Sequence, residues 1–411
     1  MAVTGPNTGF TLTESGVTSD LGNRYVSKDY LLDVYPNLVS PTGNRTSPGL
    51  YVWGFQTSPS GEYFLGLGDS NHRSSPVQLG SLSNWNMASY GDTHVIALKT
   101  DGTLWGWGGD SGSRGAFGVV TNLGGTYSTP IQLGADTNWK FVKAGRLLSV
   151  GLKNDGSMWA TGYNLDGQLG FGTGGVNVSS WTQIGSDTNW KQLVYGEYSG
   201  YALKNNGTLW SWGFNGSGQL GHGNIVHRSS PTQVGSLTNW KQVSAGLRYG
   251  MAVKTDGTLW AWGHNNVGQL GLGDLVHRSS PVQVGSLTNW KEVSCGGWAC
   301  FAIKTDGTLW AWGHNPAGDL GLNDTNSRSS PVQVGSLTNW KRVFGACGKA
   351  IKTDGTLWGW GRNSEGNVGV GTATDRSSPI QIGTETTWKS CNYDGYNTTR
   401  MTTFAIKDGY F

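Results

Sequence analysis

Residues 226–241 read Val-His-Arg-Ser-Ser-Pro-Thr-Gln-Val-Gly-Ser-Leu-Thr-Asn-Trp-Lys, and the same letters return at 276–291 with a single change. Two marker series extend this repeat along most of the chain. A Trp that opens a Trp-Lys-like segment recurs at Trp85, Trp139, Trp190, Trp240, Trp290, Trp340 and Trp388. A Gly that closes a Trp-x-Trp-Gly-like strand recurs at Gly54, Gly108, Gly162, Gly213, Gly263, Gly313 and Gly361. Both series have a step of about 50 residues, which is typical of repeat architectures such as propellers.

Each repeat reads as four short strands. In the fourth repeat we expect them at 240–245, 251–254, 258–262 and 281–284, because these segments are short and rich in β-favouring residues. An Asp-Gly or Asn-Gly pair lies between the second and third strand of each repeat, as at 256–257, and predicts a two-residue type I′ hairpin. Seven four-stranded antiparallel sheets without a helical period predict an all-β fold, a seven-bladed β-propeller.

The tryptophans support this architecture. Of the 21 Trp, only Trp181 and Trp298 lie outside three fixed positions of the repeat. In the third strand of the fourth repeat, Trp260 and Trp262 share one face and Leu259 and Ala261 share the other. Large residues that face small ones let neighbouring sheets pack closely, so most of the Trp have a structural role.

The two ends of the repeat region complete each other. A third strand without a preceding hairpin partner occurs at 50–54, and the chain stops at 407–411 where another third strand is due. We therefore predict that residues 50–54 pair antiparallel with residues 402–407. This pairing closes the ring and leaves no open sheet edge.

Two motifs identify a family resemblance. Residues 259–274, Leu-Trp-Ala-Trp-Gly-His-Asn-x-x-Gly-Gln-Leu-Gly-x-Gly-Asp, and residues 253–257, Val-Lys-Thr-Asp-Gly, resemble the regulator of chromosome condensation repeat. The resemblance covers 49–411 and implies a seven-bladed propeller closed by both termini. Its members include a nuclear guanine-nucleotide exchange factor, an inhibitor of β-lactamases, and phage or bacterial proteins, which this chain looks most like. The fold does not fix the function.

Composition excludes several classes of protein. Glycine supplies 67 of the 411 residues, and charged residues make up 13% of the chain, where about 25% is usual. The net charge of +3 is too small to predict a nucleic-acid partner, and no apolar stretch is long enough to span a bilayer. The first six residues lack the pattern of a signal peptide, so we expect synthesis in the cytoplasm.

Motifs of catalysis are nearly absent, and we expect no enzyme, no catalytic residue and no cofactor. Residues 170–175 fit Gly-x-Gly-x-x-Gly by spacing, but the helix that a dinucleotide site requires does not follow. Six of the Asp residues sit in the hairpin turns, where their role is backbone geometry. No pair of carboxylates stands apart from the repeat as an acid–base couple would.

Histidine, lysine and cysteine also follow the repeat. His264 and His314 are equivalent, but other repeats carry Tyr, Phe or Arg there, so we predict no metal site. A Lys near each turn is interpreted as part of a solvated edge: Lys99, Lys153, Lys204, Lys254, Lys304, Lys352 and Lys407. Four Cys without a C-x-x-C spacing predict no disulfide framework, and Cys295 and Cys391 are interpreted as small apolar fillers.

The repeats differ mainly between their first and second strands. An antiparallel meander places these loops on one rim with the loops between the third and fourth strands, and the uniform hairpins on the other rim. Varied loops on a rigid scaffold are typical of binding proteins, although loops also drift where change is tolerated. The predicted partner-binding residues are His94, Arg146, Tyr198, Arg248, Tyr249, Trp298, Tyr396 and Arg400.

Residues 1–48 lie outside the repeat and are predicted to form an extended arm, with a short helical turn at 27–35. Its apolar side chains need cover from the propeller or from another protein. The predicted docking residues are Phe10, Tyr25, Tyr30, Leu31, Leu32 and Tyr35. The leading hypothesis is a non-catalytic protein-binding propeller in a larger assembly such as a phage virion, where it decorates the particle or recognises a host surface molecule. The alternatives are an exchange factor for a small GTPase, and a protein inhibitor or lectin.

Overall fold

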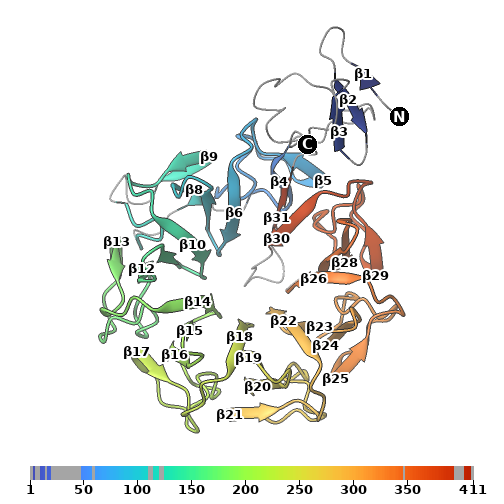
Figure 1. Cartoon of the computed structure of the whole chain (residues 1–411). Coiled ribbons are helices and arrows are strands. Elements are labelled where there is room, and N and C mark those ends of the chain that lie inside the picture. Colours follow the sequence, from blue (N-terminus) through green and yellow to red (C-terminus); the bar gives the residue numbers. More distant parts are fainter. Residues whose placement is uncertain are drawn as a thin grey trace. The chain divides into compact units, whose positions relative to one another are not determined.

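The computed structural model (Figure 1) describes residues 48–57, 61–109, 114–119, 125–345, 348–392 and 402–408, and the backbone of three short strands before residue 20. The chain divides into two units, Met1–Pro48 with Asp408–Phe411, and Gly49–Lys407. In the first unit, β1 (Val3–Thr4), β2 (Phe10–Thr13) and β3 (Gly16–Ser19) form an antiparallel sheet. The helical turn expected at 27–35 lies outside the described residues.

The second unit is a ring of seven four-stranded antiparallel sheets, which confirms the predicted seven-bladed propeller (Figure 1). The blades are numbered here along the chain. Blade 1 is β6 (Trp85–Tyr90), β7 (His94–Lys99), β8 (Leu104–Gly109) and β9 (Thr126–Gln132). Blade 2 is β10 (Trp139–Ala144), β11 (Leu148–Lys153), β12 (Met158–Gly162) and β13 (Val178–Gln183). Blade 3 is β14 (Trp190–Tyr195), β15 (Ser199–Lys204), β16 (Leu209–Gly213) and β17 (Arg228–Gln233).

The remaining blades repeat this pattern. Blade 4 is β18 (Trp240–Ala245), β19 (Tyr249–Lys254), β20 (Leu259–Gly263) and β21 (Arg278–Gln283). Blade 5 is β22 (Trp290–Gly296), β23 (Ala299–Lys304), β24 (Leu309–Gly313) and β25 (Arg328–Gln333). Blade 6 is β26 (Trp340–Phe344), β27 (Lys349–Lys352), β28 (Leu357–Gly361) and β29 (Arg376–Gln381). Blade 7 is β30 (Trp388–Asn392), β31 (Thr402–Lys407), β4 (Gly49–Gly54) and β5 (Arg73–Gln78).

Blade 7 closes the ring with strands from both ends of the propeller. Its strand order is β30-β31-β4-β5, and β31 pairs antiparallel with β4 from Thr402↔Gly54 to Lys407↔Gly49. The predicted pairing of residues 50–54 with residues 402–407 is therefore confirmed. Without this pairing, β31 and β4 would each present an open sheet edge.

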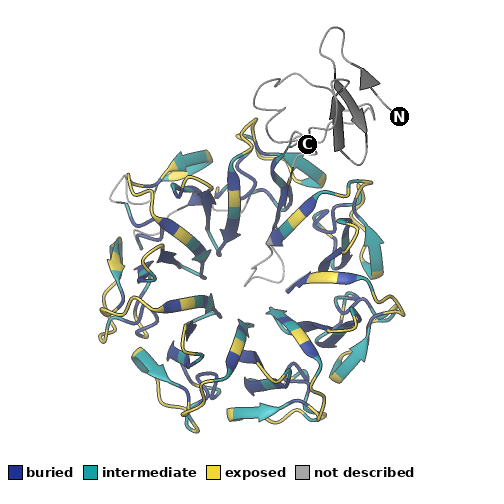
Figure 2. Cartoon of the chain, viewed as in Figure 1, coloured by how far each residue is buried: buried dark blue, intermediate teal, exposed yellow. Residues whose placement is uncertain are grey.

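The core lies between the blades (Figure 2). The second strand is buried along its whole length, as in β19, while the outermost strand stays half-exposed, as in β21. Trp262 is fully buried, and its indole nitrogen donates a hydrogen bond to the backbone oxygen of Gln219 in the preceding blade. A Cβ at Gly221, also in the preceding blade, would lie 3.2 Å from the Trp262 ring. The expected packing of large residues against small ones is thus what joins adjacent blades.

The Asp-Gly hairpins are one residue longer than predicted. The Gly257 nitrogen donates to the Lys254 oxygen, and the Lys254 nitrogen donates to the Thr258 oxygen. Gly257 has a φ of 78°, whereas Asn323 is the one described non-Gly residue with a positive φ, so Asp256 is not left-handed. These features define a type I turn followed by a Gly bulge, and the type I′ prediction is wrong. The Asp256 carboxylate instead accepts hydrogen bonds from the nitrogen and the hydroxyl of Thr258.

The lysine series is not a solvated edge. Each of the seven lysines is at most 8% exposed, and in blade 4 the Lys254 ammonium lies 3.6 Å from the centre of the Trp260 ring and 4.9 Å from that of Trp240. The sequence interpretation is therefore corrected. A cation held against aromatic faces is attracted by their quadrupoles, which offsets part of the cost of its burial. The long aliphatic stem of the lysine packs with the same rings.

One disulfide was not expected. Cys295 and Cys300 are direct cross-strand partners in β22 and β23, and the structure joins them in a disulfide. The interpretation of Cys295 as an apolar filler is wrong, because four residues separate it from its partner Cys300, a spacing that the C-x-x-C pattern does not include. Cys391 lies fully buried in the core.

No helix in the part of the chain that the structure describes is long and apolar enough to cross a membrane.

Candidate binding face

Two sets of loops share one end of the propeller. In blades 2 to 5 the loop after the third strand is bonded to the loop that precedes the second strand of the same blade. The Phe214 nitrogen donates to the Tyr198 oxygen at 3.0 Å, the His264 nitrogen to the Arg248 oxygen at 2.9 Å, and the His314 nitrogen to the Trp298 oxygen at 3.0 Å. We call this end the variable rim, and the opposite end, formed by the Asp-Gly and Asn-Gly turns, the hairpin rim.

The loops of the variable rim are also tied from blade to blade. The Asp92 nitrogen donates to the Arg146 oxygen, the Glu197 nitrogen to the Leu247 oxygen, and the Leu247 nitrogen to the Gly297 oxygen, at 3.0, 2.9 and 3.1 Å. These bonds leave the backbone of the loops little freedom relative to the blades. The side chains on the rim are therefore displayed from a rigid support.

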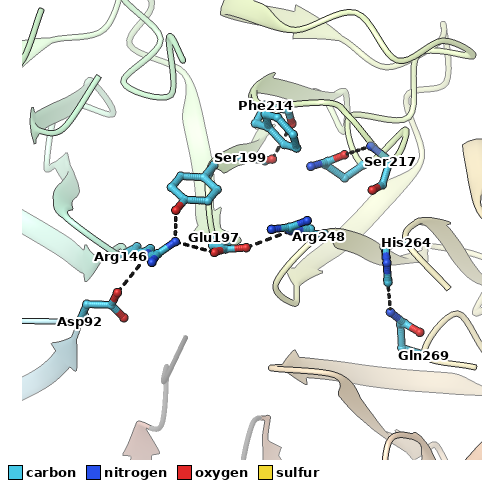
Figure 3. A network of polar contacts seen from close by, with 11 residues as sticks. Asp92, Arg146, Glu197, Ser199, Phe214, Ser217, Arg248, His264 and Gln269 are labelled. Carbon is cyan, nitrogen blue, oxygen red and sulfur yellow. Dashed lines mark hydrogen bonds and ion pairs between the residues drawn. The ribbon is translucent and has the colours of Figure 1, made fainter. Parts of the chain in front are cut away.

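A chain of ion pairs crosses blades 1 to 4 on this rim (Figure 3). Arg146 donates from its Nε to Asp92 at 2.8 Å and from an Nη to Glu197 at 2.7 Å. The second oxygen of Glu197 accepts from the Nε of Arg248 at 3.1 Å, and Arg146 also contacts the hydroxyl of Tyr198. Sequence reasoning did not single out Glu197, although it lies in the variable loops. The signal available in the sequence was an acidic residue in the same set of loops as the predicted contact residues Arg146 and Arg248.

The positive charge of Arg146 is stable at neutral pH. Burial acts to lower the pKa of Arg146, but the hydrogen bonds and charges of Asp92 and Glu197 raise it overall. The side chain of Glu197 is 14% exposed and that of Arg248 is 42% exposed. Glu197 thus serves to hold two arginines, while much of the Arg248 guanidinium stays open to solvent.

Two aromatic stacks flank Arg248. In one, Tyr198 lies 6.4 Å from Phe214, which lies 4.6 Å from His227. In the other, three rings follow one another at 5.1 and 4.5 Å, in the order Trp298, His264 and His277. Burial, and then the charges of His277 and Arg248, lower the pKa of His264 to about 4, so its ring is neutral at neutral pH.

Two predicted contact residues are not on the surface. His94 is fully buried and its Nε2 lies 2.9 Å from the hydroxyl of Ser149. Tyr249 is also fully buried and donates to the backbone oxygen of Ala299. Both begin second strands, and their side chains turn into the core between blades. We therefore drop them from the set of residues that a partner can touch.

The structure brings Arg146, Tyr198, Arg248 and Trp298 onto the variable rim, all partly exposed. Other predicted residues cannot be placed. Tyr396 and Arg400 lie outside the described residues, as do Tyr25, Tyr30, Leu31, Leu32 and Tyr35 of the arm, and only the backbone of Phe10 is described, in β2.

The described residues contain no group of three or more His, Cys, Asp or Glu that could hold a metal ion. A cavity of about 180 Å³ is lined by innermost strands, with repeat positions such as Gln192, Gln242 and Ser244 in its wall. The described residues that line it include no Asp, Glu or His.

Comparison with known families identifies the repeat. The model described as regulator of chromosome condensation (RCC1) repeat matches residues 206–253, 256–303, 306–350 and 354–391. A second model of the same repeat matches residues 190–219, 240–269 and 290–318.

Curated relatives match in part. The RCC1 domain-containing protein RUG3, mitochondrial, of Arabidopsis thaliana is 30% identical over 142 residues, which cover 32% of this chain and 31% of that protein. The ultraviolet-B receptor UVR8 of the same plant is 31% identical over 172 residues, 40% of this chain and 38% of the receptor. The chain thus matches about a third of the length of these relatives.

A solved structure of Prp20p from Saccharomyces cerevisiae is similar to the whole propeller. Its TM-score is 0.76 at 20% identity, and the match covers 89% of this chain and 92% of the yeast chain. At that identity the likeness shows the fold alone.

Proposed function

Because this chain carries RCC1 repeats, we propose that it is a non-catalytic propeller that binds a protein partner through its variable rim. The observation that carries the proposal is the display of individual Arg, Tyr and Trp side chains on a backbone that is bonded from blade to blade. These residue types dominate the energetics of protein interfaces. A rigid support lowers the entropy lost on binding.

The relatives support protein binding as a use of this fold. Prp20p from yeast is described with binding properties to Gsp1p and histones, and a second structure shows Kap60 bound to yeast RCC1. The dog protein named X-linked retinitis pigmentosa GTPase regulator is 29% identical over 144 residues. The matches named here come from plants, mammals and yeast, so the virion and phage-origin hypotheses gain no support and are not carried further.

The test is a quantitative affinity capture from lysate of the source cells. The tagged intact chain is compared with the double variant Tyr198→Ala/Trp298→Ala, and with Thr255→Glu/Thr305→Glu on the hairpin rim as a matched control. Thr255 and Thr305 are exposed, so this control changes two surface side chains without touching the core. We expect the wild type and the control to retain the same protein and the rim variant to lose it.

An identical set of retained proteins for all three forms would contradict the proposal. If the retained protein is a small GTPase, release of a fluorescent nucleotide from it distinguishes an exchange factor from a simple binder. Acceleration by the wild type and not by Tyr198→Ala/Trp298→Ala would assign the exchange alternative to the same rim.

A further inference from the structure

The surface of the variable rim is not uniform. The loop after the third strand carries two adjacent exposed apolar residues only in blades 3 and 4 of the part of the chain that the structure describes. Ile225 and Val226 are 64% and 61% exposed, and Leu275 and Val276 are 57% and 61% exposed. We call these four residues the apolar sector. Blade 5 carries Thr325 and Asn326 at the same positions.

The two halves of the apolar sector are neighbours. The loop of blade 3 is bonded to the outer strand of blade 4 through the Gly223 nitrogen and the Ser279 oxygen, at 2.7 Å. Val226 and Val276 each precede the exposed histidine that ends an aromatic stack, His227 or His277. The sector therefore continues into the stacks that flank Arg248. Exposed apolar surface of this kind commonly marks an interaction site.

The charge beside the sector is positive because blade 3 lacks an acid that blades 4 and 5 carry. In blades 4 and 5 the Arg that opens the fourth strand pairs with an Asp four residues earlier, Arg278 with Asp274 at 2.5 Å and Arg328 with Asp324 at 2.6 Å. In blade 3 that Asp is Asn224. Among the described residues, no acidic side chain forms an ion pair with Arg228, and its Nε is buried without a hydrogen-bond partner.

The second cation is Arg248, which the two aromatic stacks flank. Arg248 uses its Nε for Glu197, and its half-exposed guanidinium has no other carboxylate partner among the described residues. Glu197 is in turn shared with Arg146, so the chain of Asp92, Arg146, Glu197 and Arg248 is neutral in sum. Arg228 adds one positive charge. A partner that fits this surface needs apolar side chains together with at least one carboxylate.

We infer that the apolar sector, with Arg228 and Arg248, binds a segment of a partner protein in which acidic and large apolar side chains alternate closely. This inference rests on the proposed function and names the chemistry of the partner and the sector of the rim that recognises it. Two observations converge on it. Before an Arg that opens a fourth strand, the Asp is missing in blades 3 and 6, and of these two blades blade 3 also carries an apolar pair.

The repeat supplies variants that the fold already accommodates. Ile225→Thr/Val226→Asn/Leu275→Thr/Val276→Asn copies the sequence of blade 5 into blades 3 and 4. Asn224→Asp gives Arg228 the carboxylate that Arg278 and Arg328 have. Thr372→Asp is the matched control, because it places the same acid at the same position of blade 6, four residues before Arg376, away from the sector.

The probe is a displayed library of random peptides of about 12 residues, selected on the immobilised full chain. We expect enrichment of peptides that combine Asp or Glu with Leu, Ile or Phe. Binding of the enriched peptides should weaken between about 50 and 300 mM salt, because solvent-exposed charges are screened. The fourfold apolar variant should lower the affinity about tenfold or more, and Asn224→Asp severalfold, with Thr372→Asp unchanged.

Several results would overturn the inference. These are enrichment without acidic residues, full binding by the fourfold variant, or an equal effect of Asn224→Asp and Thr372→Asp. A dimer in solution that the fourfold variant dissociates would make a second copy of the chain the occupant and would also overturn it. Circular dichroism melting of each variant establishes that it is folded.

The failure of this inference can be told apart from the failure of the proposed function. If the captured partner is lost with Tyr198→Ala/Trp298→Ala but retained with the fourfold variant, the variable rim binds and the apolar sector does not. If both variants retain the partner, both proposals fail.

Discussion

Single residues that differ from the equivalent residue in other blades give individual blades their own properties. His94 is such a residue, because the equivalent position in blade 2 is Leu148. The ring of His94 is fully buried, and burial lowers its pKa to about 4, with the bond to Leu148 acting in the opposite direction. The unfolded chain therefore binds a proton at this residue at a higher pH than the folded chain does.

This shift gives the first prediction. Stability that depends on neutral His94 is present above the unfolded pKa of 6.5 and is lost as the pH falls through about 4. Because of His94, the free energy of unfolding of the wild type should fall by roughly 2 kcal/mol between pH 7 and pH 5. The variant His94→Leu should not show this decrease. Urea unfolding of both proteins at the two pH values measures it, and parallel pH profiles would contradict the assignment.

Glu292 is a second departure, on an innermost strand. Gln192 and Gln242 each bridge to the next blade, accepting from one backbone nitrogen and donating to the oxygen of the same residue, Val243 or Val293. Glu292 accepts from the Val343 nitrogen at 3.2 Å but has no amide to donate. Burial raises its pKa, which the Val343 bond and nearby cations, Arg342 first, counteract in part.

We predict that Glu292→Gln stabilises the protein by about 1 kcal/mol at neutral pH, because the amide completes the bridge. A raised pKa means that the stability contributed by Glu292 is present at acid pH and is lost as the pH rises through the folded pKa. The gain should therefore shrink near pH 4. Gln242→Glu is the reverse control and should destabilise. Equal melting temperatures for wild type and Glu292→Gln at neutral pH would contradict this account.

At the scale of elements, the hairpins show what sequence can and cannot give. The Asp-Gly and Asn-Gly pairs located the hairpin turns of blades 1 to 6, yet the turn was predicted one residue too short. The reason is that Asp256 bonds Thr258, whose hydroxyl accepts from the indole nitrogen of Trp260, and this chain favours a type I turn with a Gly bulge. Such side-chain bonds decide between turns that share the same residue pair.

The Gly bulge also explains why the hairpins are uniform. A Cβ at Gly257 would lie 2.1 Å from the backbone oxygen of Thr288, in the segment that connects blade 4 to the next blade, whereas a Cβ at Gly285 would meet nothing within 4 Å. Both glycines have a positive φ, of 78° and 62°. We predict that Gly285→Ala costs about 1 kcal/mol through backbone strain alone.

Gly257→Ala should cost about 3 kcal/mol or more, because the clash with the neighbouring blade adds to the strain. Thermal and chemical unfolding of the two variants under the same conditions measures the difference. Equal costs would mean that the hairpin rim does not depend on close contact between blades.

At the scale of the whole molecule, the sequence was sufficient for the blade number and the ring closure, because both follow from counting a regular repeat. It was not sufficient for the rim. The ion pairs of Arg146 and Arg248 with Glu197 join residues about 50 positions apart in the sequence. His94 and Tyr249 are buried, although in the sequence they look as variable as the exposed residues beside them. The Cys295–Cys300 bond likewise depends on cross-strand register. Such contacts arise only when blades are placed side by side.

Closure of the ring leads to a prediction for the intact propeller. Deletion of residues 402–411 removes β31, so β30 and β4 lose their partner and expose open edges. We expect the truncated chain to aggregate, whereas deletion of residues 409–411 alone leaves the paired strands in place. Size-exclusion chromatography and thermal melting compare the two. A truncated chain that is monomeric with an unchanged melting temperature would refute the closing role of β31.

The central claim is that the variable rim, and not the hairpin rim, meets the partner. It is tested most directly by photo-crosslinking in lysate of the source cells, with p-benzoylphenylalanine in place of exposed Asn266 on the variable rim or of exposed Thr255 on the hairpin rim. The account predicts a discrete crosslinked protein from position 266 and none from position 255. The same crosslinked protein from position 255, with none from position 266, would contradict it.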